Sequence, residues 1–292
     1  VRRLMDEYEG TFTVGEVGEG KGAAKIMGEY TRGNDRLNMA YSFEMLGGAF
    51  SAEFFRNSVS NFFRDAPDGW PCWAFSNHDV VRHISRWDVE TDATDLVARQ
   101  GIALMVSLQG TKCLYQGEEL GQTETELSFD EIVDPPGLKF WPEYKGRDGC
   151  RTPMTWEHEA EHAGFSNATP WLPVKPAQAA RAVDTQDGEG SVLAHYRRVL
   201  SFYRSTDALR FGGSDFLDLE EPVLAFWRDG ASDILCLFNM SSDKVTLNVQ
   251  GALESVGPSN ISHTSESGLS LPPHGFGWLL GDRAKATISR ER

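Results

Sequence analysis

Two acidic side chains follow predicted apolar strands, where a parallel sheet presents side chains to a ligand. Glu16 lies in TVGEVGEG after the strand predicted over 11–14, and Asp79 lies in FSNHD after the strand predicted over 70–75. Residues just past the carboxyl ends of parallel strands line the ligand site in barrels and doubly wound sheets. Two carboxylates facing one cleft suit glycosidic-bond cleavage, because one donates a proton to the leaving oxygen and the other opposes the positive charge that develops on the sugar. Taken alone, each residue fits a structural role better, as a cap or loop acceptor.

The elements that would position these side chains alternate along the chain. Strands are predicted over 11–14, 36–43, 70–75 and 111–115, and helices over 52–64, 93–107 and 192–203. Because parallel strands need a crossover that a helix usually supplies, this alternation indicates a parallel α/β architecture. Apolar residues at helical spacing from Val1 to Tyr8 predict a helix that is already under way at the first residue and ends at Gly10.

The pattern changes in the second part of the chain. The stretch 117–190 is rich in Pro, Gly, Trp and charge and is too long for an unstructured loop in a compact domain, so we expect a functional loop or small subdomain. Short β runs follow over 224–227, 234–238, 245–249 and 276–280, and their spacing predicts an antiparallel β-sandwich. We therefore place a domain boundary near Thr206, with one domain over 1–206 and another over 207–292.

Composition restricts the partners. The 292 residues carry 43 acidic and 28 basic side chains, and the net charge of −15 repels phosphate backbones and anionic lipid surfaces. We therefore expect a neutral substrate, and neither nucleic acid nor a membrane as partner. No apolar run approaches the roughly 18 residues of a membrane helix, and the amino terminus lacks the apolar core of a signal peptide. Four dispersed cysteines without a CxxC pair indicate free thiols of a reducing compartment, so we predict a cytoplasmic location.

Four motifs occur in order along the chain: TVGEV, FSNHDVVRH, LYQGEELG and DGCRTPMTW. With these spacings, and with a β domain behind them, the sequence resembles the α-glucosidase and oligo-1,6-glucosidase branch of the α-amylase superfamily from residue 11 to about 280. The resemblance implies an α/β fold, in which the second half of a (β/α)8 TIM barrel is followed by an antiparallel β-sandwich domain.

The resemblance also implies roles for individual residues. Glu16 corresponds to the general acid/base, and Asp79 to the carboxylate that stabilises the transition state. His78 resembles a hydrogen-bond donor to sugar hydroxyls, and Arg151 resembles an arginine at the rim of the active site. The two glutamates of LYQGEELG are expected to be structural. Four aromatic residues of the long loop are available to contact a sugar ring or to form the core of a subdomain: Phe140, Trp141, Tyr144 and Trp171.

One part of the family pattern is absent from the sequence. The nucleophile of these enzymes is an aspartate that follows the fourth strand in a short motif with an arginine, and nothing similar occurs in the 292 residues. We therefore expect the chain to represent the carboxyl-terminal half of such an enzyme, with the upstream half as its partner. No cofactor is expected in this chain, whereas a structural metal ion would belong to the upstream half.

The resemblance favours a retaining, exo-acting α-glucosidase that releases glucose from the non-reducing end of short α-glucosides, with this chain inactive on its own. One alternative is an α-glucosyltransferase or sucrose-type hydrolase of the same superfamily. Another alternative is a catalytically inactive binding or scaffold subunit, as in the glucosidase-like heavy chains of amino-acid transporters. The presence of both Glu16 and Asp79 favours an enzyme.

Overall fold

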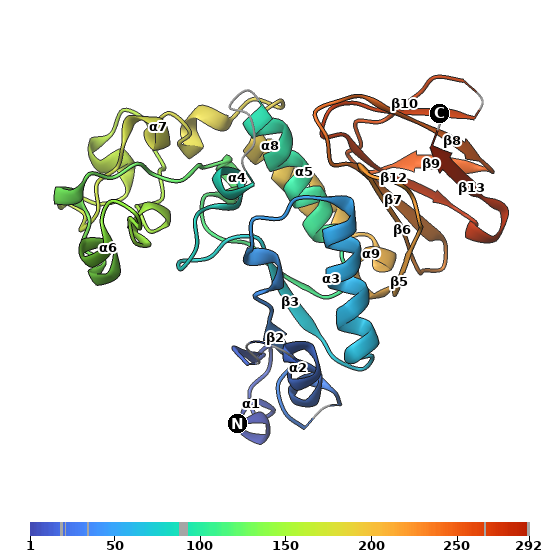
Figure 1. The fold of residues 1–292 in the computed structure, drawn as a ribbon, viewed down its shortest axis with the longest axis horizontal. Coiled ribbons are helices and arrows are strands. Elements are labelled where there is room, and N and C mark those ends of the chain that lie inside the picture. Colours follow the sequence, from blue (N-terminus) through green and yellow to red (C-terminus); the bar gives the residue numbers. More distant parts are fainter. Residues whose placement is uncertain (18–19, 21, 34, 88–92, 266, 291–292) are drawn as a thin grey trace. The chain divides into compact units, whose positions relative to one another are not determined.

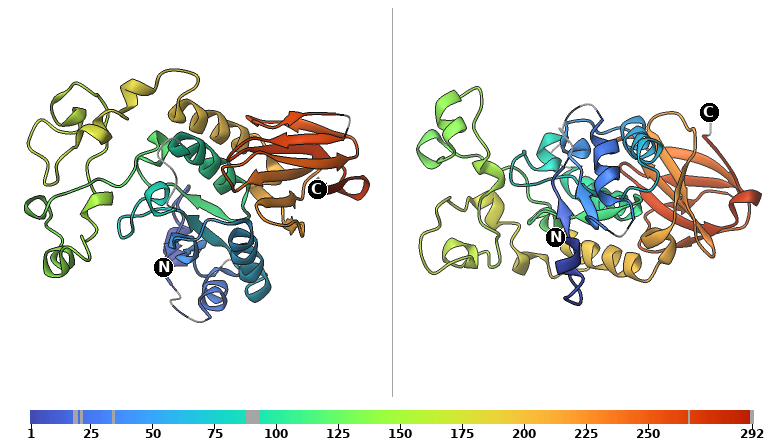
Figure 2. Two further views of the ribbon diagram at one scale, coloured as in Figure 1. Left: turned by 45° about the horizontal axis from the view of Figure 1, so that its top comes forward. Right: turned by 90° about the horizontal axis from the view of Figure 1, so that it is seen from below.

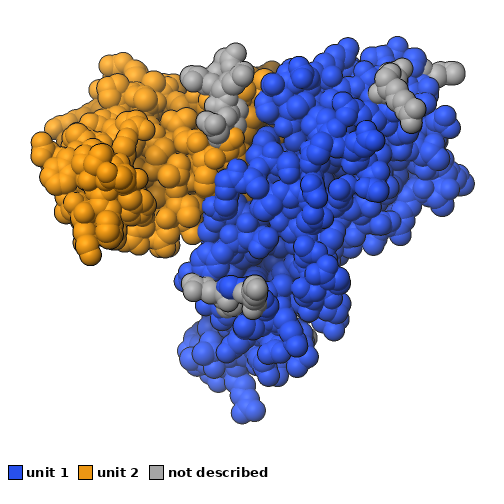
Figure 3. All heavy atoms as spheres, in the orientation of Figure 1, with its two compact units in different colours: residues 1–74, 102–113, 199–292 blue, residues 75–101, 114–198 orange. Residues whose placement is uncertain are grey.

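A computed structural model describes residues 1–17, 20, 22–33, 35–87, 93–265 and 267–290 (Figure 1). The chain divides into two compact units that interleave along the sequence (Figure 3). Unit 1 comprises residues 1–74, 102–113 and 199–292, and unit 2 comprises residues 75–101 and 114–198. The domain boundary predicted near Thr206 stays a prediction.

A four-stranded sheet in unit 1 confirms the predicted parallel α/β architecture. Its strands are β1 (Val14–Gly15), β2 (Met39–Tyr41), β3 (Pro71–Ala74) and β4 (Thr111–Cys113), in the order β1-β2-β3-β4. All three neighbouring pairs are parallel. β1 and β4 are therefore the edge strands of this sheet.

These strands are shorter than the apolar runs that predict them. The strand expected over 11–14 begins only at Val14, because the Asn38 side chain accepts the Thr13 backbone N–H at 2.9 Å. The strand expected over 36–43 is restricted to Met39–Tyr41. Main-chain hydrogen bonds extend one residue beyond these bounds, since Ser42 N–H donates to the Cys72 oxygen and Met39 N–H donates to the Thr13 oxygen.

Two helices of unit 1 follow β1 and β2. The prediction of a helix over 52–64 is confirmed by α3 (Ala52–Asp65), where the Ser51 hydroxyl accepts the Phe54 N–H at 3.1 Å and caps the helix. Its buried face includes Phe55, Val59 and Phe62. The helix α2 (Ala23–Thr31) was not predicted, since it is short and contains Gly28, which lowers helix propensity.

The helix predicted from Val1 to Gly10 is present, but it is much shorter than predicted. The helix α1 (Arg2–Met5) has only four residues and no buried side chain. Leu4 and Tyr8 are 57% and 61% exposed, so the apolar stripe has no surface in the described chain to pack against. A helix this short is unstable in water without such packing.

The carboxyl-terminal part of unit 1 is the antiparallel β-sandwich that the sequence predicts. One sheet has the order β5-β6-β7-β12-β9 and the other β10-β11-β8-β13. Figure 2 shows these strands of the carboxyl-terminal part from two further sides. The strands are β5 (Ser214–Phe216), β6 (Val223–Arg228), β7 (Asp233–Asn239), β8 (Val245–Gln250), β9 (Leu253–Val256), β10 (Ser262–His263), β11 (Gly268–Leu271), β12 (Phe276–Gly281) and β13 (Thr287–Arg290). Both sheets contribute to one apolar core, in which Leu237, Leu247 and Leu279 are fully buried.

Two side chains of this β domain form hydrogen bonds with Ser107, the last residue of α5 (Thr94–Ser107). The buried guanidinium of Arg228 donates to the backbone oxygens of Ser107, Gly212 and Gly213. The Trp278 ring N–H donates to the Ser107 hydroxyl at 2.8 Å. These bonds satisfy polar groups at a helix end, which would otherwise be costly to bury.

Unit 2 is built mainly from short turns and single-turn helices. They are α4 (His83–Arg86), η3 (Glu118–Leu120), η4 (Phe129–Glu131), α6 (Pro135–Phe140), η5 (Asp148–Cys150), η6 (Glu161–Gly164), α7 (Pro176–Ala179) and η7 (Val183–Gln186). The longer helices α5 and α8 (Val192–Arg204) each have residues in both units, and their bounds match the predicted ones closely. A small apolar cluster of Leu127, Ile132 and Leu172, with Trp141 packed against it, lies within the long segment 117–190.

Candidate functional site

The FSNHD motif forms a tight loop at the start of unit 2. The Asn77 side-chain oxygen accepts the Asp79 backbone N–H at 2.8 Å, which closes the turn that carries His78. The Ser76 hydroxyl oxygen accepts the His83 backbone N–H at 2.8 Å. The loop 76–83 is therefore joined at both ends, and the side chain of Asp79 remains 43% exposed.

Two arginines hold the Asp79 carboxylate. Arg147 Nη1 lies 3.0 Å and Arg151 Nη2 lies 2.9 Å from the same oxygen, Asp79 Oδ1. Arg151 also donates its Nε–H to the backbone oxygen of His78 at 2.6 Å. The other carboxylate oxygen, Oδ2, lies 3.6 Å from the His78 ring nitrogen Nε2. The structure thus brings together three of the predicted site residues: His78, Asp79 and Arg151.

These contacts favour the charged form of Asp79. Partial burial alone would raise the pKa of the carboxyl group. The neighbouring His78 and the hydrogen bonds from Arg151 and Arg147 outweigh burial and hold the Asp79 pKa below its usual value. A carboxylate that stays ionised can oppose positive charge on a bound ligand.

Arg147 was missed by the sequence analysis, although it stands four residues before Arg151. Its guanidinium donates to both oxygens of Asp134, at 2.8 and 3.0 Å, and the Arg147 backbone N–H donates to Asp134 at 2.9 Å. The buried Asp148 carboxylate in turn accepts the backbone N–H groups of Val133 and Asp134, at 2.6 and 2.8 Å. We call Asp79, Arg147, Arg151, Asp134 and Asp148 the Asp79 cluster.

Glu16 belongs to unit 1 and directly follows β1, as predicted. Its side chain is exposed. A Cβ atom at the preceding Gly15 would lie 2.2 Å from Leu37 Cδ1, so a larger residue there would require the end of the Leu37 side chain to move. Since Asp79 belongs to unit 2, the shared cleft expected for the two carboxylates stays a prediction.

The four aromatic residues proposed to contact a sugar differ in their surroundings. Phe140, Tyr144 and Trp171 are 51%, 44% and 66% exposed, whereas Trp141 packs against the small apolar cluster and against the ring of Phe129. Trp171 lines a hollow of about 610 Å³ in unit 2, together with His158, His162 and Lys175. The exposed rings remain candidates for sugar contact, whereas Trp141 is partly buried against the small apolar cluster.

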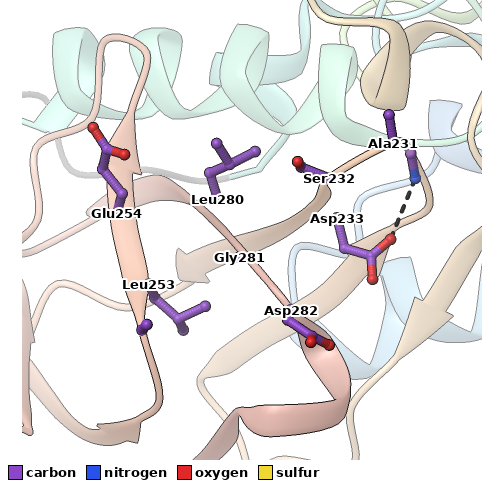
Figure 4. Close-up of a pocket in the computed structure, with 10 residues that line it drawn as sticks. Ala231, Ser232, Asp233, Leu253, Glu254, Leu280, Gly281 and Asp282 are labelled. Atoms are coloured by element: carbon purple, nitrogen blue, oxygen red, sulfur yellow. Dashed lines mark hydrogen bonds between the residues drawn. The ribbon is translucent and has the colours of Figure 1, made fainter.

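A second hollow, of about 700 Å³, lies in the β domain (Figure 4). It is lined by residues of the β6–β7 turn and of β9 and β12, including Asp233, Glu254 and Asp282. Asp233 accepts the Gly230 backbone N–H at 3.3 Å. None of the predicted site residues lines this hollow.

Across the ranges that the structure describes, no group of three or more His, Cys, Asp or Glu side chains is arranged to hold a metal ion. Within the same ranges, no helix is long and apolar enough to cross a membrane. The four cysteines are free.

The parallel strands and the helices between them define an α/β class of protein. Residues 1–212 match the α-amylase catalytic domain, and the chain belongs to the α-amylase family. The fold is accordingly the second half of a (β/α)8 barrel followed by an antiparallel β-sandwich domain.

Several relatives show how this chain compares with other members. A probable α-glucosidase of Rhizobium meliloti (strain 1021) is 46% identical over 248 residues, which cover 84% of this chain and 45% of that protein. An oligo-1,6-glucosidase of Heyndrickxia coagulans is 28% identical over 289 residues, covering 85% of this chain and 50% of that protein. The chain spans about half the length of these curated relatives.

A solved structure is similar over nearly the whole chain. The crystal structure of the α-glucosyl transfer enzyme XgtA superposes with a TM-score of 0.88 at 41% identity. The match covers 96% of this chain and 53% of that one.

Proposed function

We propose that this chain is the carboxyl-terminal half of a retaining, exo-acting α-glucosidase that acts on short α-glucosides. The observation that carries the proposal is the Asp79 carboxylate, which Arg147 and Arg151 hold in its charged form in the Asn77–Asp79 turn. The names of the relatives support the same class of activity. The long segment 117–190 favours a walled pocket over an open groove, and thus short substrates.

In the proposed mechanism, Glu16 protonates the glycosidic oxygen while a nucleophilic aspartate outside these 292 residues attacks the anomeric carbon. Glu16 then acts as the base that activates water against the glucosyl-enzyme intermediate. Asp79 opposes the positive charge of the transition state, and His78 donates a hydrogen bond to sugar hydroxyls. We place the enzyme in the cytoplasm, with no nucleic acid or membrane as partner.

A second candidate is an α-glucosyltransferase, which the 41% identity to an α-glucosyl transfer enzyme favours. The two functions differ in how well the site excludes water from the glucosyl-enzyme intermediate. Product analysis on maltose and on sucrose separates them, because hydrolysis gives free glucose and transfer gives longer or isomeric glucosides. A full-length gene product that turns over neither sugar would instead support a binding or scaffold subunit.

Glu16→Gln tests the role of the proton donor in the full-length gene product. Hydrolysis of maltose should fall about 10²- to 10⁴-fold, because its leaving group, a glucose hydroxyl, departs poorly without a proton donor. Hydrolysis of an activated aryl α-glucoside should fall much less. Glu29→Gln is the matched control, since Glu29 is an exposed glutamate of α2. Equal losses on both substrates would contradict the role of Glu16.

The position of the nucleophile has its own test. The 292-residue chain alone should not hydrolyse maltose, whereas a gene product that also carries the first barrel half should. Turnover of maltose by this chain alone would overturn the proposal that the nucleophile lies outside it.

A further inference from the structure

The carboxylate of Asp134 is buried next to the guanidinium of Arg147, which also contacts Asp79. The Asp134 side chain is 1% exposed, whereas those of Arg147 and Asp79 are 34% and 43% exposed. All three residues belong to unit 2. A carboxylate this deeply buried is costly unless charged or hydrogen-bonding partners satisfy it. Asp134 is thus placed to act on Asp79 through Arg147, without touching a ligand itself.

The guanidinium of Arg147 uses different nitrogens for the two carboxylates. Nε and Nη2 share one edge of the planar group and donate to Asp134 Oδ2 and Oδ1, at 3.0 and 2.8 Å. The third nitrogen, Nη1, donates to Asp79 Oδ1 at 3.0 Å. Two nitrogens on one edge can bind both oxygens of a carboxylate. Because Asp134 occupies this edge, Arg147 reaches Asp79 through one bond.

Asp134 is itself held in one orientation. Its Oδ2 accepts the Arg147 backbone N–H at 2.9 Å, and its own backbone N–H donates to Asp148 at 2.8 Å. The same Asp148 oxygen accepts the Val133 backbone N–H at 2.6 Å, and Asp148 is fully buried. The guanidinium of Arg147 is therefore bound by a carboxylate that both its backbone and its side chain fix in place.

One oxygen of Asp79 takes both arginine bonds. Arg147 and Arg151 donate to Oδ1, at 3.0 and 2.9 Å. The other oxygen, Oδ2, lies 3.6 Å from His78 Nε2, beyond hydrogen-bond distance. Within the described part of the chain, this arrangement leaves Oδ2 open to a ligand. A guanidinium of Arg147 that was free to turn would bind Oδ2 as well.

The charges of this group balance. Hydrogen bonds from Arg147 lower the pKa of Asp134 against the effect of burial, so the Asp134 carboxylate is charged. Asp79 alone would face two arginines, Arg147 and Arg151, and the site would carry excess positive charge. Asp134 offsets one of these charges. Such a balance matters at a carboxylate that opposes positive charge in a transition state.

We propose that Asp134 is a positioning residue, which holds Arg147 to a single bond with Asp79 Oδ1 and offsets its charge. Oδ2 and the negative charge of Asp79 then stay available to the substrate. The inference rests on the proposed function, because it concerns the carboxylate to which we assign the stabilisation of the transition state.

Steady-state kinetics of the full-length gene product test this role. Asp134→Asn keeps the size of the side chain and removes its charge. Its kcat on maltose should fall about 10- to 100-fold with little change in KM, because the loss arises in the transition state. The control is Asp187→Asn, at an exposed aspartate of unit 2, which should match the wild type. An unchanged kcat in Asp134→Asn, or a loss confined to KM, would overturn the proposal.

Arg147→Lys changes the other partner of the pair and replaces Asp134→Asn if that variant does not fold. Lysine keeps the positive charge but cannot bind both oxygens of Asp134 through one planar edge. The kcat should fall about tenfold, again with little change in KM. A variant with the kcat of the wild type would show that the planar group is not needed, contrary to the proposal.

A double variant tests whether Asp134 acts through Arg147. Asp134→Asn combined with Arg147→Met should lose no more activity than the more impaired of the two single variants, because both substitutions break the same connection to Asp79. Losses that multiply would show that Asp134 acts independently of Arg147, and the inference would be wrong.

Inhibitor binding reports the charge of the site without turnover. 1-Deoxynojirimycin is a basic analogue of glucose that carries a positive charge when protonated. The wild type should bind it more tightly than glucose, and this preference should fall at least about tenfold in Asp134→Asn and persist in Asp187→Asn. An equal preference in the wild type and in Asp134→Asn would contradict the proposed charge balance.

A crystal structure of the full-length Asp134→Asn protein tests the positioning independently of activity. The guanidinium of Arg147 should have left its position or bound both oxygens of Asp79, and an unmoved guanidinium would overturn the inference. A wild type that neither binds nor hydrolyses glucosides would instead contradict the proposed function. The position of Arg147 in the variant would still decide the role of Asp134.

Discussion

The β domain and the Asp79 cluster are stabilised by different interactions. In the β domain, alternate side chains from two sheets form an apolar core, of which Leu237, Leu247 and Leu279 are typical. In the Asp79 cluster, hydrogen bonds of 2.6 to 3.0 Å join carboxylates, guanidinium groups and backbone groups. Apolar contacts have no required direction and tolerate substitutions that conserve volume. Hydrogen bonds to a charged group require a defined direction.

This difference suits different tasks. A sandwich core needs only volume and apolar surface, so it supports the fold. A carboxylate that stabilises charge must be held in one orientation. The bonds of Arg147 to both Asp134 oxygens fix the guanidinium, which in turn donates to Asp79. We therefore expect substitutions of large buried side chains in the β domain to lower the free energy of unfolding strongly. Substitutions in the Asp79 cluster should lower it less.

The largest loss of stability is expected for Trp278→Ala. The Trp278 side chain is fully buried, packs against the rings of Phe202 and Phe276, and donates to the Ser107 hydroxyl. Its removal should lower the free energy of unfolding by about 3–5 kcal/mol, as measured by urea denaturation. Trp278→Phe is the control, since it keeps a ring and loses the N–H donor, and should cost about 1 kcal/mol. Similar small losses in both variants would show that packing in this domain matters less than we argue.

A smaller loss is expected for Asp148→Ala. The buried Asp148 carboxylate accepts two backbone N–H groups, those of Val133 and Asp134, and its removal leaves both without this acceptor. The free energy of unfolding should fall by about 1–3 kcal/mol. Asp148→Asn keeps an acceptor oxygen and should cost less. If the Ala and Asn variants were both as stable as the wild type, the buried carboxylate would not be holding this segment.

The sequence predicted the β domain and the parallel α/β architecture because alternating strand patterns and strand-helix patterns are local. It did not predict where β1 starts, since this depends on the contact of Thr13 with Asn38, 25 residues away. Arg147 was missed for a similar reason, because its bond to Asp79 joins residues 68 positions apart. Glu16, His78, Asp79 and Arg151 were predicted as site residues from their positions after strands and from short motifs, whereas the residues that orient Asp79 and Arg151 carry no local pattern.

The smallest effect is expected from the acid titration of Asp79. A carboxyl group whose pKa is lowered by folding contributes stability above its unfolded-state pKa, near 3.8, and loses that contribution as the pH falls through its folded-state pKa. The wild type should therefore lose more thermal stability than Asp79→Asn between pH 5 and about pH 2.5. The difference should be modest and should shrink with added salt, because the Asp79 side chain is 43% exposed and solvent screens its pairs with Arg147 and Arg151. Parallel melting curves for the two proteins across this range, at low salt, would show that the arginines do not stabilise the Asp79 carboxylate in the folded state.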